Sequence, residues 1–203
     1  MKGKFYNYSL WSVHAPTEPS EEEDKDAFYN KLEQCLDECP QADIKIVIGD
    51  FNAQVGKEVI YKPTIGMNSL HQVSNDNGKR MIGLAASRGL VVGSSLFPHK
   101  RIHLATWKSN DGSTTNQIDH ILMSARHISG LEDVRTYRGA NVDSDHYLVI
   151  SKIRARISTA RNQRNIPQQK WNLEKLKDPE TKLLFADTID SKLRNEAQGA
   201  GVD

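Results

Sequence analysis

Carboxylates and imidazoles follow short apolar runs at three places in the sequence. The three segments are Gly49-Asp50-Phe51-Asn52, Ile118-Asp119-His120-Ile121 and Ser144-Asp145-His146-Tyr147. Layered sheets assemble their sites at strand ends, because rigid strands direct side chains into a common crevice. A single Asp-His pair is weak evidence, since Asp often caps a turn and His is often an ordinary surface residue. The repetition of the pattern favours one shared site.

The elements before the first segment follow the order strand, helix, strand. Residues 5–13 alternate aromatic and apolar side chains with period two and predict a strand buried on both faces, which Pro16 ends. Ser20 and Glu23 form a capping box, and Pro40 ends the helix that follows. The apolar positions of that helix are Phe28, Leu32, Cys35 and Leu36. Residues 44–48 predict a short strand that leads directly into Gly49.

The rest of the chain predicts two further helices and five strands. Asn75 or Asp76 caps a helix that buries Met81, Leu84 and Ala85 and ends at Gly89. The strands are expected at residues 90–92, 104–107, 118–123, 133–137 and 147–153. Pro179 begins an appended helix with an apolar stripe at Phe185, Ile189 and Leu193. The pattern predicts a layered α/β sandwich in residues 1–157 and a basic linker with a helix in residues 158–203.

Composition and charge restrict the class of protein. The chain has 203 residues, of which 37% are hydrophobic and 26% charged, as expected for a globular chain with its own core. No apolar run approaches the roughly 20 residues of a membrane span. The two cysteines, four residues apart, fit a reducing compartment better than a disulfide framework, and no zinc-ligand spacing surrounds them. The net charge is +1, but residues 146–172 contain basic side chains and no acidic ones. This segment either attracts polyanions or is a solvated linker with ordinary basic residues.

The three segments together resemble a known superfamily. Asp50 and Asn52 in GDFNA, Asp119 in NQIDHIL and the Asp-His pair in SDHYLV resemble the endonuclease/exonuclease/phosphatase superfamily, which includes the AP endonucleases. The segments HAPT from His14, FPHKRIH from Phe97 and RGA from Arg138 resemble more closely the endonuclease domain of non-LTR retrotransposons and craniofacial development protein 2-like proteins. This resemblance covers residues 6–153, and residues 171–180 resemble the linker before the reverse transcriptase in such polyproteins.

The resemblance implies both a fold and an activity. The fold would be part of a two-sheet α/β sandwich of the AP-endonuclease/deoxyribonuclease-like type. Its N-terminal portion would be missing, because the family's early Asn and its metal-binding Glu have no counterpart in this sequence. The activity would be Mg²⁺- or Mn²⁺-dependent hydrolysis of DNA, impaired by the absent Glu and linked to a downstream reverse transcriptase domain. Action on chromosomal DNA would require the nucleus, but the sequence itself leaves the compartment open.

The resemblance also implies catalytic roles, which agree with the chemistry of the residue types. Asp50 would accept a proton from the attacking water, and Asn52 would orient that water or donate to the phosphate. His146 would donate a hydrogen bond to the scissile phosphate. Asp119 would bond the other ring nitrogen of His146 and fix its tautomer.

The metal and substrate contacts follow from the same resemblance. Asp145 would bind Mg²⁺, together with Asp50 and Asn52, because this ion prefers oxygen ligands. His14 stands where the superfamily often has Tyr and would contact phosphate. Trp107 would stack on a base or sugar beside the cleavage point, or would be an ordinary core aromatic on a strand.

Other functions are compatible with the same residues. A phosphatase or lipid phosphodiesterase of the same superfamily would share the site, since site chemistry alone does not name the substrate. A noncatalytic nucleic-acid-binding remnant would use the basic residues between Lys152 and Lys170 and would bind DNA in a salt-sensitive way without cutting it. An incomplete sandwich that folds poorly is the simplest alternative.

Overall fold

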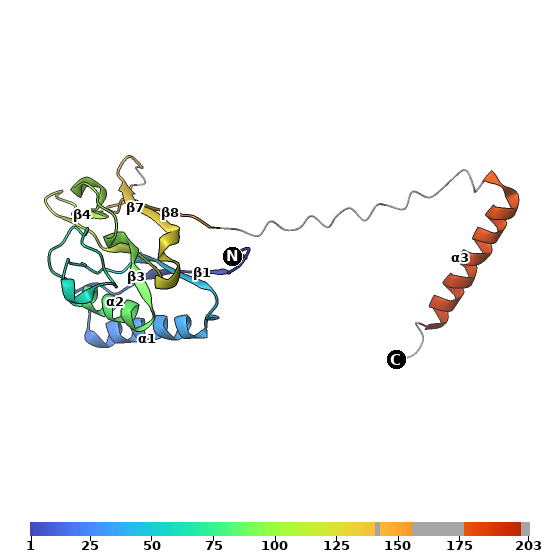
Figure 1. The fold of residues 1–203 in the computed structure, drawn as a ribbon, viewed down its shortest axis with the longest axis horizontal. Helices are drawn as coiled ribbons and strands as arrows, with labels where there is room; N and C mark the ends of the chain where they lie inside the picture. Colours follow the sequence, from blue (N-terminus) through green and yellow to red (C-terminus); the bar gives the residue numbers. More distant parts are fainter. Residues whose placement is uncertain (141–142, 156–176, 200–203) are drawn as a thin grey trace. The chain divides into compact units, whose positions relative to one another are not determined.

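The computed structural model describes residues 1–140, 143–155 and 177–199 (Figure 1). The chain divides into two compact units, Met1–Thr159 and Ala160–Asp203. The described part of the second unit consists of helix α3 (Pro179–Gly199) and the two residues before it. The boundary expected at residue 157 and the basic linker lie outside the described residues, so the domain division remains a prediction.

A four-stranded sheet forms the centre of the first unit. Its strand order is β1-β2-β6-β3, in which β1 runs parallel to β2 and the other neighbours are antiparallel. Its strands are β1 (Tyr8–His14), β2 (Ile44–Asp50), β6 (Asp119–Ser124) and β3 (Leu90–Val92). Two smaller sheets consist of β4 (Trp107–Lys108) with β5 (Thr115–Asn116), and β7 (Leu131–Tyr137) with β8 (Leu148–Ile153).

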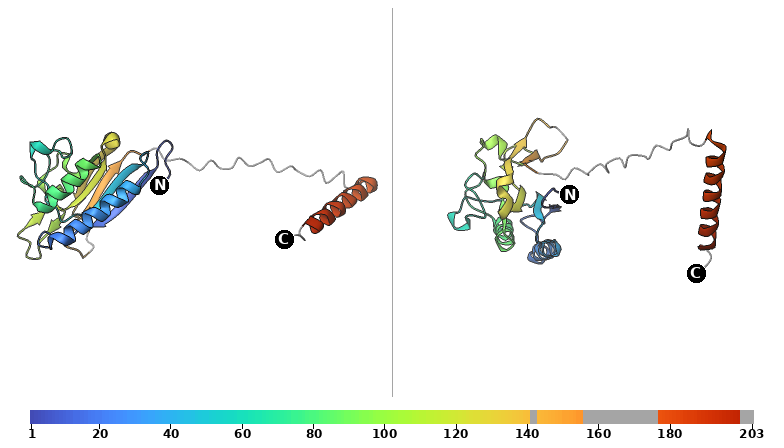
Figure 2. Two further views of the ribbon diagram at one scale, coloured as in Figure 1. Left: turned by 90° about the horizontal axis from the view of Figure 1, so that it is seen from below. Right: turned by 45° about the vertical axis from the view of Figure 1, so that its right-hand side comes forward.

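The central sheet is covered on both faces. Helices α1 (Glu22–Glu38) and α2 (Asp76–Ser87) lie side by side along one face (Figure 2). Leu36 of α1 and Met81 of α2 join Val47 and Leu122 of the sheet in the larger hydrophobic core. On the other face, Ile46, Met123, Val134 and other apolar residues form a second core with β7 and β8. Each fully buried aliphatic side chain contributes about 1.5–3 kcal/mol relative to exposure. The expected layered α/β sandwich is therefore confirmed.

The helix ends follow local signals more closely at α2 than at α1. The Asn75 side chain caps α2 by accepting from the Gly78 amide at 2.8 Å, and Gly89 follows the helix with φ +61. Helix α1 ends before Pro40, as expected. The predicted capping box is wrong, because Ser20 Oγ lies 3.0 Å from Thr17 Oγ1 and Glu21 holds the cap position without a side-chain bond. Acidic residues in the first turn complement the helix dipole instead.

Three strand predictions need correction. Strand β1 is not buried on both faces, since Leu10 on one face is 55% exposed. In the described residues β1 is an edge strand of the central sheet. The strand expected at residues 104–107 is limited to Trp107–Lys108, because the chain before it turns and Ala105 donates to the Arg101 carbonyl. The partner β5 was not expected, because two-residue strands have no periodicity to detect.

The apolar stripe on α3 is exposed, with Phe185 at 42%, Ile189 at 41% and Leu193 at 59%. Among the described residues, no helix is both long enough and apolar enough to cross a membrane.

Candidate active site

Three strands of the central sheet place one polar side chain each at the same edge. His14 ends β1, Asp50 ends β2 and Asp119 begins the antiparallel β6. The register pairs His14 with Asp50, and Asp50 with Asp119. Neighbouring strands lie about 4.7–4.9 Å apart, so paired residues point to the same face within contact distance. The sheet register alone therefore brings these three side chains into one row.

The turn after β2 fixes the carboxylate of Asp50. Asp50 Oδ1 accepts from the Asn52 amide at 2.8 Å, and the Phe51 amide donates to the Ile118 carbonyl at 3.0 Å. Phe51 itself is fully buried in the larger core. Asn52 Nδ2 donates to the Ala15 carbonyl at 2.9 Å. The second oxygen, Asp50 Oδ2, faces the two imidazoles of His14 and His146 at 3.7 and 3.9 Å.

His146 reaches the row from a different direction. Its backbone forms an isolated bridge with Trp107, and the next amide, of Tyr147, donates to the Thr106 carbonyl at 2.7 Å. His146 Nδ1 lies 3.0 Å from Asp119 Oδ2. An ionised carboxylate only accepts hydrogen bonds, so Nδ1 carries the proton in this contact. The other nitrogen, Nε2, then faces Asp50, and the side chain is 32% exposed.

Buried Thr106 links the two halves of this arrangement. Its side chain accepts hydrogen bonds from the amides of Ile118 and Asp119 at 3.0 and 3.1 Å, and its residue is only 2% exposed. Burial raises the pKa of Asp119, while hydrogen bonds from Thr106 and His146 act in the opposite direction. Asp119 is thus a desolvated carboxylate whose neighbours only partly offset the cost of burying its charge.

Asp145 and Trp107 pair with each other at the exposed rim. Trp107 Nε1 donates to Asp145 Oδ2 at 2.8 Å, and this hydrogen bond lowers the pKa of Asp145. Trp107 is partly exposed and belongs to none of the hydrophobic cores in the described residues. His14 lies at the other end of the row with a side chain that is 78% exposed. The rim thus offers an aromatic ring and an imidazole to a ligand.

Among the residues that the structure describes, one group of side chains could hold a metal ion. Single ligand atoms of Asp50, Asp119 and His146 all lie within 4.8 Å of one another. Two carboxylates and one imidazole suit a divalent cation such as Mn²⁺, and the oxygens alone suit Mg²⁺. Asp50 Oδ2 fits this role, because its nearest imidazole nitrogens are farther away than a hydrogen bond. The sequence assigned Asn52 and Asp145 as further ligands, and those two assignments remain predictions.

His120 is a supporting residue that the sequence analysis did not separate from Asp119. Strand alternation directs it away from the site, and it is almost fully buried. Its Nε2 donates to the Ala53 carbonyl at 2.8 Å, and Nδ1 accepts from the Ser94 hydroxyl at 2.6 Å. Burial lowers the pKa of His120 to about 4. The neutral ring therefore supports the loop that follows Asp50, and period-two alternation was the signal that could have found it.

Comparison with known proteins gives relatives in sequence and in fold. No protein-family model matches the sequence. The chain is 35% identical over 156 residues to craniofacial development protein 2 of Tragulus javanicus. The match covers 77% of this chain and 27% of that relative, so the chain spans about a quarter of the relative's length.

Two solved structures share the fold at low sequence identity. One is a 3′ phosphatase from Neisseria bound to a product DNA hairpin, with a TM-score of 0.52 and 20% identity over 72% of this chain and 61% of the phosphatase. The other is an AP endonuclease from Archaeoglobus fulgidus, with a TM-score of 0.50 and 17% identity over 71% of this chain and 60% of that enzyme. Both neighbours belong to the superfamily that the motifs resemble, and the resemblance in fold is confirmed.

Proposed function

We propose that this chain, which has the fold of the endonuclease/exonuclease/phosphatase superfamily, hydrolyses phosphodiester bonds in DNA with the help of a divalent cation. The observation that supports the proposal is the convergence of Asp50, Asp119 and His146 at one edge of the central sheet. Phosphodiester hydrolysis needs a base for water, a donor for the phosphoryl oxygens and a cation for the developing charge. These residue types can meet all three needs.

Asp50 is the proposed base. Its Oδ1 is held by the Asn52 amide, so Oδ2 can accept a proton from a water molecule. The Asn52 side chain is fixed by its bond to the Ala15 carbonyl, and we expect it to orient the attacking water or to donate to the phosphate. When both ring nitrogens carry a proton, His146 donates from Nε2 to a phosphoryl oxygen while its Nδ1 donates to Asp119, which holds the ring.

A cation would be held by Asp50, with Asn52 and Asp145 as the further ligands assigned from the sequence. When bound, it would neutralise charge on the phosphate and act as a Lewis acid. Trp107 and His14, exposed on either side of the row, would contact the sugar-phosphate chain.

The direct test is nicking of supercoiled plasmid by the purified chain in MgCl₂ or MnCl₂, with EDTA as the control. In line with the impaired activity that the resemblance implies, we expect slow nicking that requires the cation and falls about 10²–10⁴-fold in His146→Ala. His99→Ala is the matched control, because His99 also pairs with a carboxylate, Asp133, at 2.6 Å but lies outside the cluster. Equal rates for the His146 variant and the wild type would refute the assignment.

Two other functions give different results in the same assay. A phosphatase would release inorganic phosphate from a duplex with a 3′-phosphate and would leave plasmid intact. A noncatalytic binder would retain plasmid on a gel at low salt and would cut nothing at any cation concentration.

The finer assignment, to the endonuclease of a retrotransposon polyprotein that acts with a reverse transcriptase in the nucleus, rests on the motifs alone. It requires that the nicked strand end in a 3′-hydroxyl, which an added reverse transcriptase can extend. Nicked products that no polymerase extends without prior phosphatase treatment would contradict it.

A further inference from the structure

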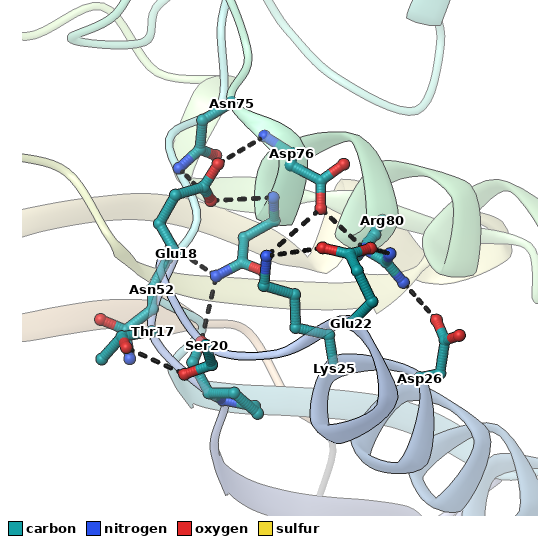
Figure 3. Close-up of polar contacts among 12 residues, drawn as sticks. Thr17, Glu18, Ser20, Glu22, Lys25, Asp26, Asn52, Asn75, Asp76 and Arg80 are labelled. Atoms are coloured by element: carbon teal, nitrogen blue, oxygen red, sulfur yellow. Dashed lines mark hydrogen bonds and ion pairs between the residues drawn. The ribbon is translucent and has the colours of Figure 1, made fainter.

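The first turn of α2 lies against both loops that carry the site residues (Figure 3). Asn77 in this turn is only 1% exposed. Its Nδ2 donates to the Pro16 carbonyl at 3.0 Å and to the Asn52 carbonyl at 3.1 Å. Because both partners are carbonyls, only the NH₂ end of the amide can face them. One side chain therefore joins the loop after β1 to the loop after β2.

The helix end that carries Asn77 is itself fixed to the loop after β1. The carboxylate of Glu18 accepts from the amides of Asp76 and Asn77 at 3.0 and 3.1 Å, and from Asn75 Nδ2 at 2.7 Å. Helix N-termini have unpaired amides and a partial positive charge, so a carboxylate there satisfies both. Figure 3 shows Glu18 reaching across to this turn.

The loop after β2 is in direct contact with the same turn. The Asn75 amide donates to the Gln54 carbonyl at 3.1 Å, and the Gln54 amide donates to Asn75 Oδ1 at 2.9 Å. A side chain at Gly78 would place its first carbon 2.1 Å from the Gln54 carbonyl oxygen. Glycine at this position therefore permits the close approach of the two segments.

Charged residues then fix α2 to α1. Lys25 and Arg80 both pair with Asp76 and with Glu22, and Arg80 also pairs with Asp26. The Arg80 and Lys25 side chains are 23% and 4% exposed, but the carboxylates they pair with are 50–64% exposed, so the shared network and not any single pair joins the helices. These ion pairs help to fix the position of the first turn of α2, which carries Asn77.

The backbone conformation of Asn52 shows why the position of this turn matters. Its φ of 47 lies in the left-handed region, which costs energy for any residue with a side chain, although Asn tolerates it better than most. Three bonds hold this conformation: the amide to Asp50, the side chain to Ala15 and the carbonyl to Asn77. Only the bond to Asn77 comes from outside the two loops.

We propose that Asn77 is a positioning residue that holds Asn52 and Asp50 in register with the loop that follows His14. This inference rests on the proposed phosphodiesterase function. Asn77 acts through the main chain of Asn52, so its loss should slow the chemical step more than it weakens substrate binding. A displacement of about 1 Å at catalytic groups can cost on the order of 10²-fold in rate.

The test compares Asn77→Ala with Asn68→Ala. Asn68 is a matched control, because its Nδ2 also donates to a main-chain carbonyl, that of Leu96 at 2.8 Å, in a loop that carries none of the site residues. With duplex DNA as substrate and below the melting temperature of both variants, we expect kcat of Asn77→Ala to fall about 10–100-fold and KM to change less than about threefold. Asn68→Ala should keep kcat within about threefold. Equal losses of kcat in both variants, or a loss confined to KM, would overturn the proposal.

Amide hydrogen exchange gives a measurement that does not depend on activity. In Asn77→Ala, the amides of Asn52 and Gln54 should exchange faster, whereas in Asn68→Ala the faster exchange should appear at Gly66. Unchanged protection of Asn52 and Gln54 would overturn the proposal. If the wild-type chain fails to cut DNA, the proposed function fails, and exchange alone decides whether Asn77 holds the loop.

Glu18→Gln is the second variant in case Asn77→Ala does not fold. It keeps the shape of the side chain but removes the charge at the α2 N-terminus, and kcat should fall about 3–10-fold with the same faster exchange at Asn52. Wild-type kcat together with wild-type exchange would count against the proposal.

Discussion

Asp50 and His146 face each other across the site, but their backbones are held differently. Asp50 ends a strand that is hydrogen-bonded to a neighbouring strand on both sides, whereas His146 lies in a loop segment with fewer main-chain hydrogen bonds. Asp50 ends a strand paired with β1 and β6, buried Phe51 follows it, and His120 supports the carbonyl of Ala53. His146 follows exposed residues, and its own amide donates to the Ser144 side chain at 3.1 Å. Two main-chain bonds join this segment to residues 106–108, from the Tyr147 amide and to the Asp145 carbonyl. Side-chain bonds from Trp107 to Asp145 and between His146 and Asp119 add to them.

This difference indicates that the fixed and the less constrained parts of the site have different roles. A base and its water need a fixed geometry, which a buried turn supplies, whereas groups that contact DNA must accommodate substrate. Segments with few internal bonds open at lower cost than core strands. The Asp50 turn and the His146 ring that Asp119 holds should therefore control the rate, and the exposed rim with Trp107 should control how substrate is held.

The largest effect should come from removing the charge on the fixed side. Asp50→Asn keeps the size of the side chain but removes the proton acceptor, so we expect the nicking rate to fall about 10³-fold or more. Asp133→Asn is the control, because Asp133 also pairs with a histidine, His99. Thermal melting should show both variants folded. More than about a tenth of wild-type activity in Asp50→Asn would show that the base lies elsewhere.

The next effect concerns the support beneath the Asp50 loop. The pKa of His120 is about 4 in the folded chain, against about 6.5 in an unfolded one. Between these values the unfolded state binds more protons, so stability should fall as pH drops from about 6.5 to 4, by on the order of 3 kcal/mol. Burial also lowers the pKa of His71, which adds a loss in the same direction.

Urea unfolding at pH 7.5, 5.5 and 4.5 measures this loss, and His120→Gln should show a clearly smaller dependence on pH. The part that remains should shrink further in the double variant with His71→Gln. An identical dependence in wild type and His120→Gln would mean that another group causes it.

The sequence was most informative where a strand or helix ends in polar residues of defined type. The three segments that contain Asp50, Asp119 and His146 could be selected because each follows or begins an apolar run. The sheet register pairs the first two residues, and the backbone bridge to Trp107 places the third. Helix α2 was predictable from its cap and its glycine, since both signals are local. The two-residue strands β4 and β5 were not, because their pairing depends on the loop around Thr106.

Asn77 shows why other parts could not be predicted. Its partners are the carbonyls of Pro16 and Asn52, which lie 61 and 25 residues away in sequence. Main-chain carbonyls carry no side-chain signature, so no pattern of residue types reveals them. For the same reason Ser20 was assigned as a cap, although Thr17 engages its hydroxyl and Glu18 caps a different helix.

A smaller effect should separate catalysis from stability at Asp119. Its pKa is raised by burial, so at pH 7 the charged form is disfavoured in the folded chain relative to the unfolded one. Asp119→Asn should therefore melt at a higher temperature than wild type at pH 7. The difference should shrink below about pH 4, where the Asp119 carboxyl of the wild type is protonated and therefore neutral like the amide of the variant. The nicking rate should fall about 10²-fold, because the ring of His146 loses its charged acceptor. A lower melting temperature at pH 7 would show that Asp119 stabilises the fold.

The smallest effect should come from the exposed rim, and it tests whether Trp107 contributes to substrate binding. Trp107→Phe keeps an aromatic face but removes the hydrogen bond from Nε1 to Asp145. Because a stacked ring contributes through its face, we expect KM for duplex DNA to rise no more than about threefold and kcat to stay unchanged. Trp107→Ala removes the face as well, and its KM should rise about tenfold or more. If both variants lose kcat equally, the hydrogen bond to Asp145 and not stacking is the function of this tryptophan, and the rim belongs with the fixed side of the site.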